Sequence, residues 1–118
     1  MLSKLRPSHL LRGDRSEQLA HQYLIQQGLH LIEKNYRCKY GELDLIMRDG
    51  ETLVIVEVRF RKSNKYGGAE ESITQTKQSR IIATTQHYLH VTKINSAIRF
   101  DVIAMSRDDN INWIKNAF

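Results

Sequence analysis

Two short apolar runs, joined by a tight turn, contain acidic residues where a buried strand would normally carry apolar side chains. The runs span residues 41–46 and 54–59, and the acids within them are Glu42, Asp44 and Glu57. A carboxylate that leaves water for an apolar environment costs several kcal/mol unless it is paired, hydrogen-bonded or bound to a cation. Metal coordination is the simplest way to meet that requirement for acids that lie close together.

The turn between the runs determines which residues face each other. Asp49-Gly50 is the strongest short-range signal for a two-residue type I′ hairpin turn, and it predicts Arg48 opposite Glu51. Counting outward from this turn gives four further facing pairs: Leu45 with Val54, Asp44 with Ile55, Leu43 with Val56 and Glu42 with Glu57.

Side chains alternate between the two faces of a strand, so this hairpin predicts one apolar and one acidic face. The apolar face carries Leu43, Leu45, Val54, Val56 and Val58, and the other carries Glu42, Asp44, Ile55, Glu57 and Arg59. Facing residues lie about 4.5–5.5 Å apart at Cβ and diagonal ones about 7–8 Å, within reach of one ion. The candidate metal ligands are therefore Asp44, Glu57 and Glu42. A β-bulge near Gly41 would move Glu42 off this face but keep Asp44 and Glu57 together.

The length and composition are those of one soluble globular domain. The chain has 118 residues, of which 41% are hydrophobic and 26% are charged, and it has no apolar run of membrane-spanning length. Residues 1–12 lack the apolar segment of a secretory signal, although their basic, acid-poor character is also that of an organelle transit peptide. We expect them to be flexible or loosely packed ahead of a single domain at 13–118. The single cysteine, Cys38, allows no internal disulfide and favours a cytoplasmic location.

An excess of positive charge favours polyanionic partners. The chain has 18 Lys and Arg residues against 13 Asp and Glu residues, a net charge of +5. Part of this charge lies just beyond the acidic hairpin, at Arg59, Arg61, Lys62 and Lys65. A basic rim around an acidic, metal-binding centre suits a phosphodiester substrate, because the rim neutralises phosphates and the centre holds the ion. The alternative interpretation is a solvated basic loop.

The expected elements follow the order α-β-β-β-α-β-β, which is typical of a small mixed α/β domain. The first helix spans residues 14–28, with Asp14 as N-cap and Glu17 at the third helical position, from which it can bond back to the cap. The other expected elements are a strand at 29–36, the hairpin, a helix at 74–89, a strand at 98–105 and a short strand at 111–114.

The second helix has an apolar stripe and several polar side chains outside it. The stripe is expected to consist of Ile81, Ile82, Thr85, Tyr88 and Leu89. Lys77 and Arg80 lie away from the stripe, and with Gln78 they are candidate nucleic-acid contacts. His87 and His90 have a spacing that could hold a metal, but no acid falls beside them in sequence, so a surface pair is the favoured interpretation.

Taken together, these motifs resemble the PD-(D/E)xK nuclease-like superfamily, whose signature is an Asp, an apolar hairpin, and Glu-x-Lys on the next strand. The matching segments here are Gly41-Glu42-Leu43-Asp44-Leu45-Ile46 and Val56-Glu57-Val58-Arg59. With Glu17, Arg61, Lys77-Gln78 and Arg99-Phe100-Asp101-Val102, the chain is similar to the bacterial YraN-like family of uncharacterised proteins. The resemblance covers about residues 13–105, and its combined spacing is more specific than the short superfamily motif.

The resemblance implies a restriction-endonuclease-like α/β fold similar to that of archaeal Holliday-junction resolvases, which bind Mg²⁺ or Mn²⁺ and cleave DNA. By this likeness Asp44 and Glu57 would be metal ligands, with the Val58 carbonyl as a third and Glu17 as an outer helper. The candidate nucleic-acid contacts are Arg61, Lys62, Lys65, Lys77, Gln78 and Arg80. Resolvase-like proteins are often dimers, because two symmetric nicks need two sites, so a homodimer is compatible with the resemblance.

One departure from the superfamily pattern affects turnover, because its lysine is replaced here by Arg59. The candidate catalytic residues are Asp44, Glu57, Arg59 and Glu17. Arginine stays protonated and cannot take a proton from water, although it can clamp a phosphate or simply neutralise Glu57. Three hypotheses follow: a metal-dependent nuclease acting on branched, flapped or single-stranded DNA, a nucleic-acid-binding module without turnover, and a protein-interaction adaptor without nucleic-acid affinity.

Overall fold

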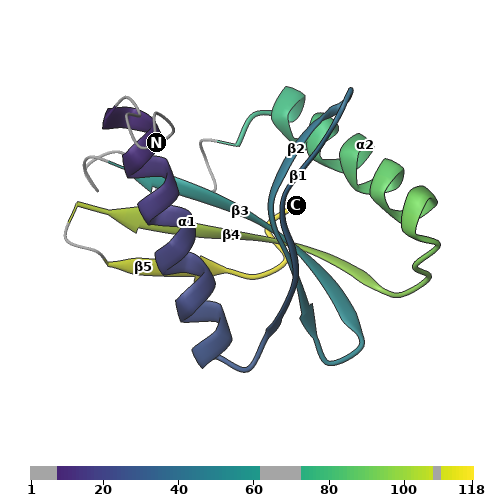
Figure 1. The fold of residues 1–118 in the computed structure, drawn as a ribbon, viewed down its shortest axis with the longest axis horizontal. Coiled ribbons are helices and arrows are strands. Elements are labelled where there is room, and N and C mark those ends of the chain that lie inside the picture. The colour runs from purple at the N-terminus through teal and green to yellow at the C-terminus, as the bar shows by residue number, and fades with distance from the viewer. Residues whose placement is uncertain (1–7, 62–72, 108–109) are drawn as a thin grey trace, which may run out of the picture.

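The chain folds into an α/β domain with the predicted order of elements (Figure 1). A computed structural model describes residues 8–61, 73–107 and 110–118, with side chains from residue 15 onward except that of Arg61. The elements are α1 (Ser8–Gln26), β1 (His30–Cys38), β2 (Gly41–Asp49), β3 (Thr52–Arg61), α2 (Gln75–Thr92), β4 (Ile98–Ser106) and β5 (Ile111–Ile114). No helix in these ranges is long and apolar enough to cross a membrane.

One mixed sheet of five strands organises the domain. The strand order is β1-β2-β3-β4-β5; β3 and β4 are parallel, α2 connects them, and the other neighbours are antiparallel. The helices α1 and α2 cover opposite faces of this sheet (Figure 1). Residues 53–57 of the central strand β3 are all buried, because a strand with a helix over each face has no solvent-facing side.

Alternate side chains of β3 divide the core into two parts. Val54 and Val56 belong to the cluster that contains Ala20 and Leu24 of α1. Leu53 and Ile55 belong to the cluster that contains Ile81 and Tyr88 of α2. Period-two alternation therefore assigns each β3 residue to one helix, and it places Glu57 on the face that α2 covers.

The first helix begins earlier than the sequence predicts. It starts at Ser8 and passes through Gly13, so Asp14 lies inside the helix and is not its N-cap. Glu17 is likewise not at the third helical position. Glycine inside a helix lowers helix stability by only about 1 kcal/mol relative to alanine, and α1 continues through Gly13 despite this cost.

The β2–β3 turn differs from the prediction by one position. Asp49 pairs with Thr52, Arg48 faces Leu53 instead of Glu51, and Leu45 faces Val56 instead of Val54. The turn residues are therefore Gly50 and Glu51, and Gly50 has the positive φ of 61° that the first central position of a type II′ turn requires. Each β2 residue therefore faces a β3 residue two positions further along the strand than predicted. Because side chains alternate between faces with a period of two, each β3 side chain stays on its predicted face.

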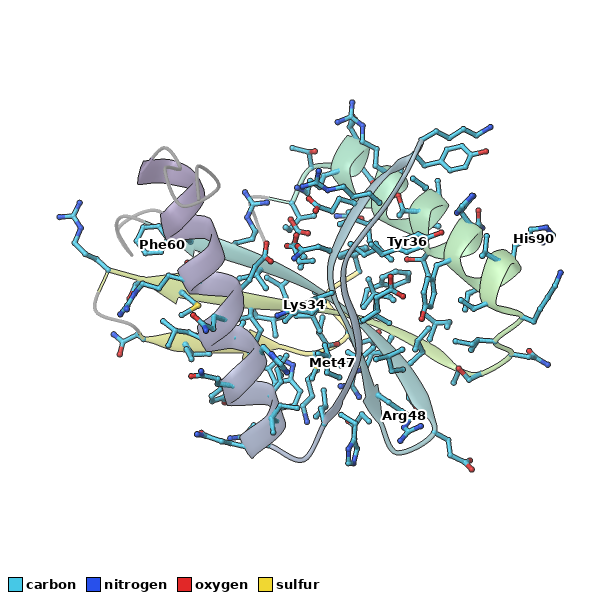
Figure 2. All side chains as sticks on the ribbon, in the orientation of Figure 1. Lys34, Tyr36, Met47, Arg48, Phe60 and His90 are labelled. Carbon is cyan, nitrogen blue, oxygen red and sulfur yellow. The ribbon has the colours of Figure 1, made fainter. Side chains whose placement is uncertain are left out.

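The predicted apolar face of β2 is wrong at Leu43. Leu45 packs in the cluster with α1, but Leu43 packs with Ile46 in the cluster with α2. Strict alternation therefore breaks between Leu43 and Leu45, where the recorded pairing of β2 with β3 ends. Beyond this point the β1–β2 hairpin lies against α2, and Figure 2 shows Tyr36 beside this helix. The Tyr36 ring packs edge-to-face on Tyr88 of α2, with ring centroids 4.9 Å apart.

The second helix begins where the sequence predicts, but its inward stripe differs at two positions. Thr74 is the N-cap, and its hydroxyl accepts a hydrogen bond from the Lys77 amide at 3.0 Å. Ile82, expected to be inward, is 39% exposed, and Thr84 is fully buried instead. Thr84 is tolerated there because its hydroxyl donates to the Arg80 carbonyl at 2.7 Å.

A fully buried aspartate, Asp101, links β4 to the C-terminal segment. Its carboxylate accepts two-pronged hydrogen bonds from Arg99, a bond from Trp113 Nε1 at 2.9 Å and a bond from the Asn116 amide at 2.9 Å. Arg99 also reaches Asp49 beside the β2–β3 turn at 3.1 Å. The Arg99-Phe100-Asp101-Val102 segment thus has a structural explanation that does not involve the acidic site.

We predict that Asp101→Ala lowers the free energy of unfolding by about 3–5 kcal/mol, because the Arg99 guanidinium and two further donors lose their buried acceptor. Urea unfolding followed by circular dichroism measures this loss. Asp49→Ala is the matched control, since it removes a single Arg99 contact at a carboxylate that is 39% exposed, and should cost under about 1 kcal/mol. Equal losses in the two variants would contradict the prediction.

Candidate functional site

Asp44 and Glu57, which the sequence singles out as metal ligands, do lie together on neighbouring strands. Glu57 is only 7% exposed, and its carboxyl group hydrogen-bonds with that of Asp44. Asp44 Oδ2 also accepts a hydrogen bond from the Val58 amide at 2.9 Å. The Asp44 side chain thus bonds the β3 backbone just beyond the last recorded β2–β3 pair, Leu45 with Val56.

Protonation of Asp44 accompanies this close approach. Burial is the largest cause and the charge of Glu57 the next, and together they raise the pKa of Asp44 to about 8, while the bond from the Val58 amide acts in the opposite direction. Two carboxyl groups that hydrogen-bond to each other must share a proton or acquire a cation. The carboxyl oxygens of the pair are therefore groups that can hold either a proton or a cation.

Two cations lie on the outer side of Glu57. Lys77 Nζ of α2 is 3.0 Å from Glu57 Oε2, and Arg59 Nη1 is 3.9 Å from the same oxygen. Arg59 shares the strand and the face of Glu57, whereas Lys77 reaches the site from the first turn of α2. The sequence predicts Arg59 beside Glu57, where the structure places it, and predicts Lys77 only as a nucleic-acid contact.

A signal in the sequence could have indicated the role of Lys77. Thr74 caps α2, so Lys77 lies three residues into the helix, where the positive end of the helix dipole disfavours a cation. A nearby anion offsets this mild cost for a lysine, and Glu57 is such an anion. Finding which anion it meets required the fold, because the two residues lie on different elements.

The other two predicted acids, Glu42 and Glu17, do not join the Asp44–Glu57 pair in a three-ligand group among the described residues. Glu42 Oε2 is bound by Arg37 Nε at 2.8 Å on the exposed β1–β2 hairpin. Glu17 of α1 is near enough that burial, followed by the charges of Glu42 and Glu57, raises its pKa, while a hydrogen bond with Asn35 lowers it. Among the residues described, no three acidic, histidine or cysteine side chains form a group that could hold one metal ion. The predicted three-acid cluster is therefore reduced to Asp44 and Glu57, and the charge of Glu17 acts on this pair by helping to raise the pKa of Asp44.

The remaining predicted contacts fall into two groups. Gln78 donates from Nε2 to the Ile73 carbonyl at 3.2 Å, so it supports its own turn, and Arg80 is exposed on α2. The side chain of Arg61 and all of Lys62 and Lys65 lie outside the described residues.

The donor set of the pair fits a hard divalent cation. Mg²⁺ and Mn²⁺ prefer oxygen ligands, and Mg²⁺ in particular is commonly held by one or two carboxylates while it keeps several waters or binds substrate phosphates. Asp44 and Glu57 supply two carboxylates, and the Val58 carbonyl is the third candidate ligand. The absence of a third carboxylate therefore does not exclude such an ion.

Comparison with known proteins places the chain in a family. A family model described as "Uncharacterised protein family UPF0102" matches residues 16–105. The chain belongs to the UPF0102 family. A UPF0102 protein of Nitrosomonas europaea is 51% identical over 109 residues, which cover 91% of this chain and 92% of the relative. Another, of Aeromonas hydrophila, is 49% identical over 115 residues, which cover 95% of this chain and 88% of the relative.

These matches confirm the likeness to the YraN-like family that the motifs indicate. The family match begins at Ser16 and ends at Met105, so it contains Glu17, the Asp44–Glu57 pair and Lys77. The UPF0102 description names no reaction, and the function must therefore be argued from the site itself.

The shared proton predicts a pH dependence of stability. Between about pH 4 and about pH 8 the folded protein holds a proton on Asp44 that the unfolded chain releases, so the free energy of unfolding falls as the pH rises. Asp44→Asn removes this titration and keeps an oxygen acceptor for the Val58 amide. We expect this variant to be more stable than the wild type at about pH 8, by several kcal/mol, because each unit of the pKa shift contributes about 1.4 kcal/mol, and nearly equal to it near pH 4.

Urea unfolding across this pH range tests the expectation. Glu33→Gln is the control, because Glu33 is an exposed acid on β1 and its removal should leave the pH dependence unchanged. Parallel curves for the wild type and Asp44→Asn would show that Asp44 does not retain its proton in the folded state.

Proposed function

We propose that this UPF0102 chain is a metal-dependent nuclease of the PD-(D/E)xK type, which hydrolyses phosphodiester bonds in DNA. The observation that carries the proposal is the hydrogen-bonded pair of Asp44 and Glu57, two mostly buried acids on neighbouring strands. The pair costs folding free energy at neutral pH, since one member is kept from ionising. A binding site for a divalent cation is the best reason for such a cost, because perturbed acids concentrate at functional sites.

The residues of the site have distinct roles in this proposal. Asp44, Glu57 and the Val58 carbonyl hold Mg²⁺ or Mn²⁺, and the bond from the Val58 amide fixes the orientation of Asp44. When bound, the ion supplies an activated water and offsets the charge that develops on the phosphate. Glu17 contributes negative charge behind the pair, as an outer helper.

The two cations at Glu57 support a phosphate-binding role. Arg59 can clamp a phosphate through two parallel hydrogen bonds but does not deprotonate. Lys77 is closer to Glu57, at 3.0 Å against 3.9 Å, and belongs to a residue type that can exchange a proton. We assign to Lys77 the part that lysine plays in the superfamily motif, and to Arg59 the holding of the phosphate.

A second candidate is a nucleic-acid-binding module that has the same fold but does not turn over. The replacement of the motif lysine by Arg59 favours this alternative. The net charge of +5 and the exposed Arg80 support nucleic-acid affinity in either case.

The first prediction of this proposal concerns metal binding. Mg²⁺ or Mn²⁺ should raise the thermal unfolding midpoint of the wild type but not that of Asp44→Asn. A metal ion that binds only the folded state adds about 2.7 kcal/mol to the free energy of unfolding when its concentration is about 100 times its Kd. Differential scanning calorimetry with and without chelator measures the shift. An equal shift in Glu33→Gln is the expected control result, and a shift that persists in Asp44→Asn would place the ion elsewhere.

The second prediction concerns cleavage. On labelled single-stranded, flap, four-way-junction and duplex DNA, the wild type should form product only with Mg²⁺ or Mn²⁺. Asp44→Asn and Lys77→Ala should reduce product to the level of the chelator control, while Asp44→Asn keeps its affinity for DNA. Arg59→Lys should retain cleavage.

Three results would change the conclusion. Product from Arg59→Lys but not from the wild type would support the binding module that lacks its lysine. Full activity of Lys77→Ala would remove Lys77 from the catalytic set. The absence of both cleavage and DNA binding in every variant would leave the protein-interaction adaptor.

A further inference from the structure

A cavity of about 350 Å³ lies between the β1–β2 turn and the middle of α2, away from the acid pair. Tyr40 of the turn forms one wall, and Ala83, Gln86, His87 and His90 of α2 form the other. Tyr40 is 44% exposed, so much of its ring remains open. The size is that of a small-ligand pocket, and the lining combines aromatic, amide and imidazole groups without an acid.

Contacts on both sides hold the cavity wall in place. The Tyr36 hydroxyl and His87 Nδ1 are 2.6 Å apart, which leaves Nε2 as the ring nitrogen that can serve a ligand. The Tyr36 ring packs in turn on the buried Tyr88. Beside the turn, a Cβ on Gly41 would lie 3.1 Å from Thr84 Oγ1, which is tighter than an ordinary contact, and Gly41 has a φ of 149°, so glycine favours this close approach of the hairpin to α2.

The cavity carries positive charge at its edge. The Lys39 ammonium lies 5.2 Å from the centre of the Tyr40 ring, and Arg80 is exposed one helical turn before Ala83. An aromatic surface beside cations is the arrangement by which proteins bind unpaired bases, since the ring stacks on the base and the cations meet the backbone. Lining groups such as Gln86 and His87 can in addition hydrogen-bond a base edge.

One side of α2 connects the cavity to the acid pair. Lys77, Arg80, His87 and His90 are spaced by three, seven and three residues, which places these four side chains, none of them buried, along one stripe of the helix. The stripe begins at the contact with Glu57 and reaches the cavity at His87. The ten residues from Lys77 to His87 rise about 15 Å, a length of about four stacked nucleotides. Figure 2 shows His90 towards the far end of this helix.

We infer that the Tyr40–His87 cavity binds an unpaired nucleobase of a strand whose phosphates run along α2 to the acid pair. The inference rests on the proposed nuclease function and specifies its substrate class, a single strand or a flap and not a continuous duplex. A paired base within a duplex cannot enter a pocket of this kind without being unstacked and flipped out.

The test measures binding in the presence of chelator, so that no cleavage occurs, by fluorescence anisotropy. The probes are a short labelled single-stranded DNA, an abasic sugar–phosphate strand of equal length, and the duplex. The wild type should bind the single strand about 10-fold more tightly than the abasic strand, in the range expected for one stacked base. Tyr40→Ala should lose this preference, and Tyr40→Phe should keep it.

Ile25→Ala serves as the control, because Ile25 is an equally exposed apolar residue, at 44%, on α1. It should bind every probe as the wild type does. Equal affinity of the wild type for the single and abasic strands, or an unchanged preference in Tyr40→Ala, would overturn the inference while leaving the nuclease proposal intact. Failure of the wild type to bind any of the three probes at low salt would overturn both.

Discussion

The hydrogen bond from the Val58 amide to Asp44 is the interaction on which the candidate site depends. The recorded pairing of β2 with β3 ends at Leu45, and the Asp44 side chain bonds the β3 backbone just beyond that point. It thereby holds a carboxylate against Glu57 at the place where the hairpin leaves β3 and crosses to α2. Because the β1–β2 hairpin leaves β3 at this point, Tyr36 and Tyr40 lie against α2. The acid pair and the aromatic cavity therefore both depend on where the pairing of β2 with β3 ends.

The order of helices and strands could be predicted from local sequence patterns, because such patterns tolerate small errors in where a turn or strand begins. The β2–β3 turn is one position away from the Asp49-Gly50 prediction, yet the β3 side chains keep their faces, because the partners change by one full strand period. Local patterns fail where tertiary contacts decide. The position of Leu43 could not be obtained from alternation, since it depends on how the β1–β2 hairpin packs against α2. The cap signal at Asp14 likewise did not locate the start of α1, which lies at Ser8.

The candidate site was predictable to the same extent. Asp44 and Glu57 stand out because acids within apolar strands are costly, and their closeness follows from adjacent strands. The sequence did not reveal that Arg37 binds Glu42 on the hairpin, or that Lys77 from a separate helix is the nearer cation at Glu57. Both contacts depend on the path of the hairpin relative to α2. The family match, which contains these residues, does not distinguish their roles.

Comparison with Asp101 supports the proposal that the Asp44–Glu57 pair has a function beyond stabilising the fold. Asp101 is completely buried, but donors from Arg99, Trp113 and Asn116 satisfy it, so its charge stabilises the link between β4 and the C-terminal segment. Asp44 accepts one backbone amide and faces another acid, an arrangement that raises its pKa. A chain that can satisfy one buried aspartate fully has no structural need to leave another beside a like charge. In the proposed function, a bound cation would give Asp44 the positive partner that Asp101 has in Arg99 and that Glu57 has in Lys77.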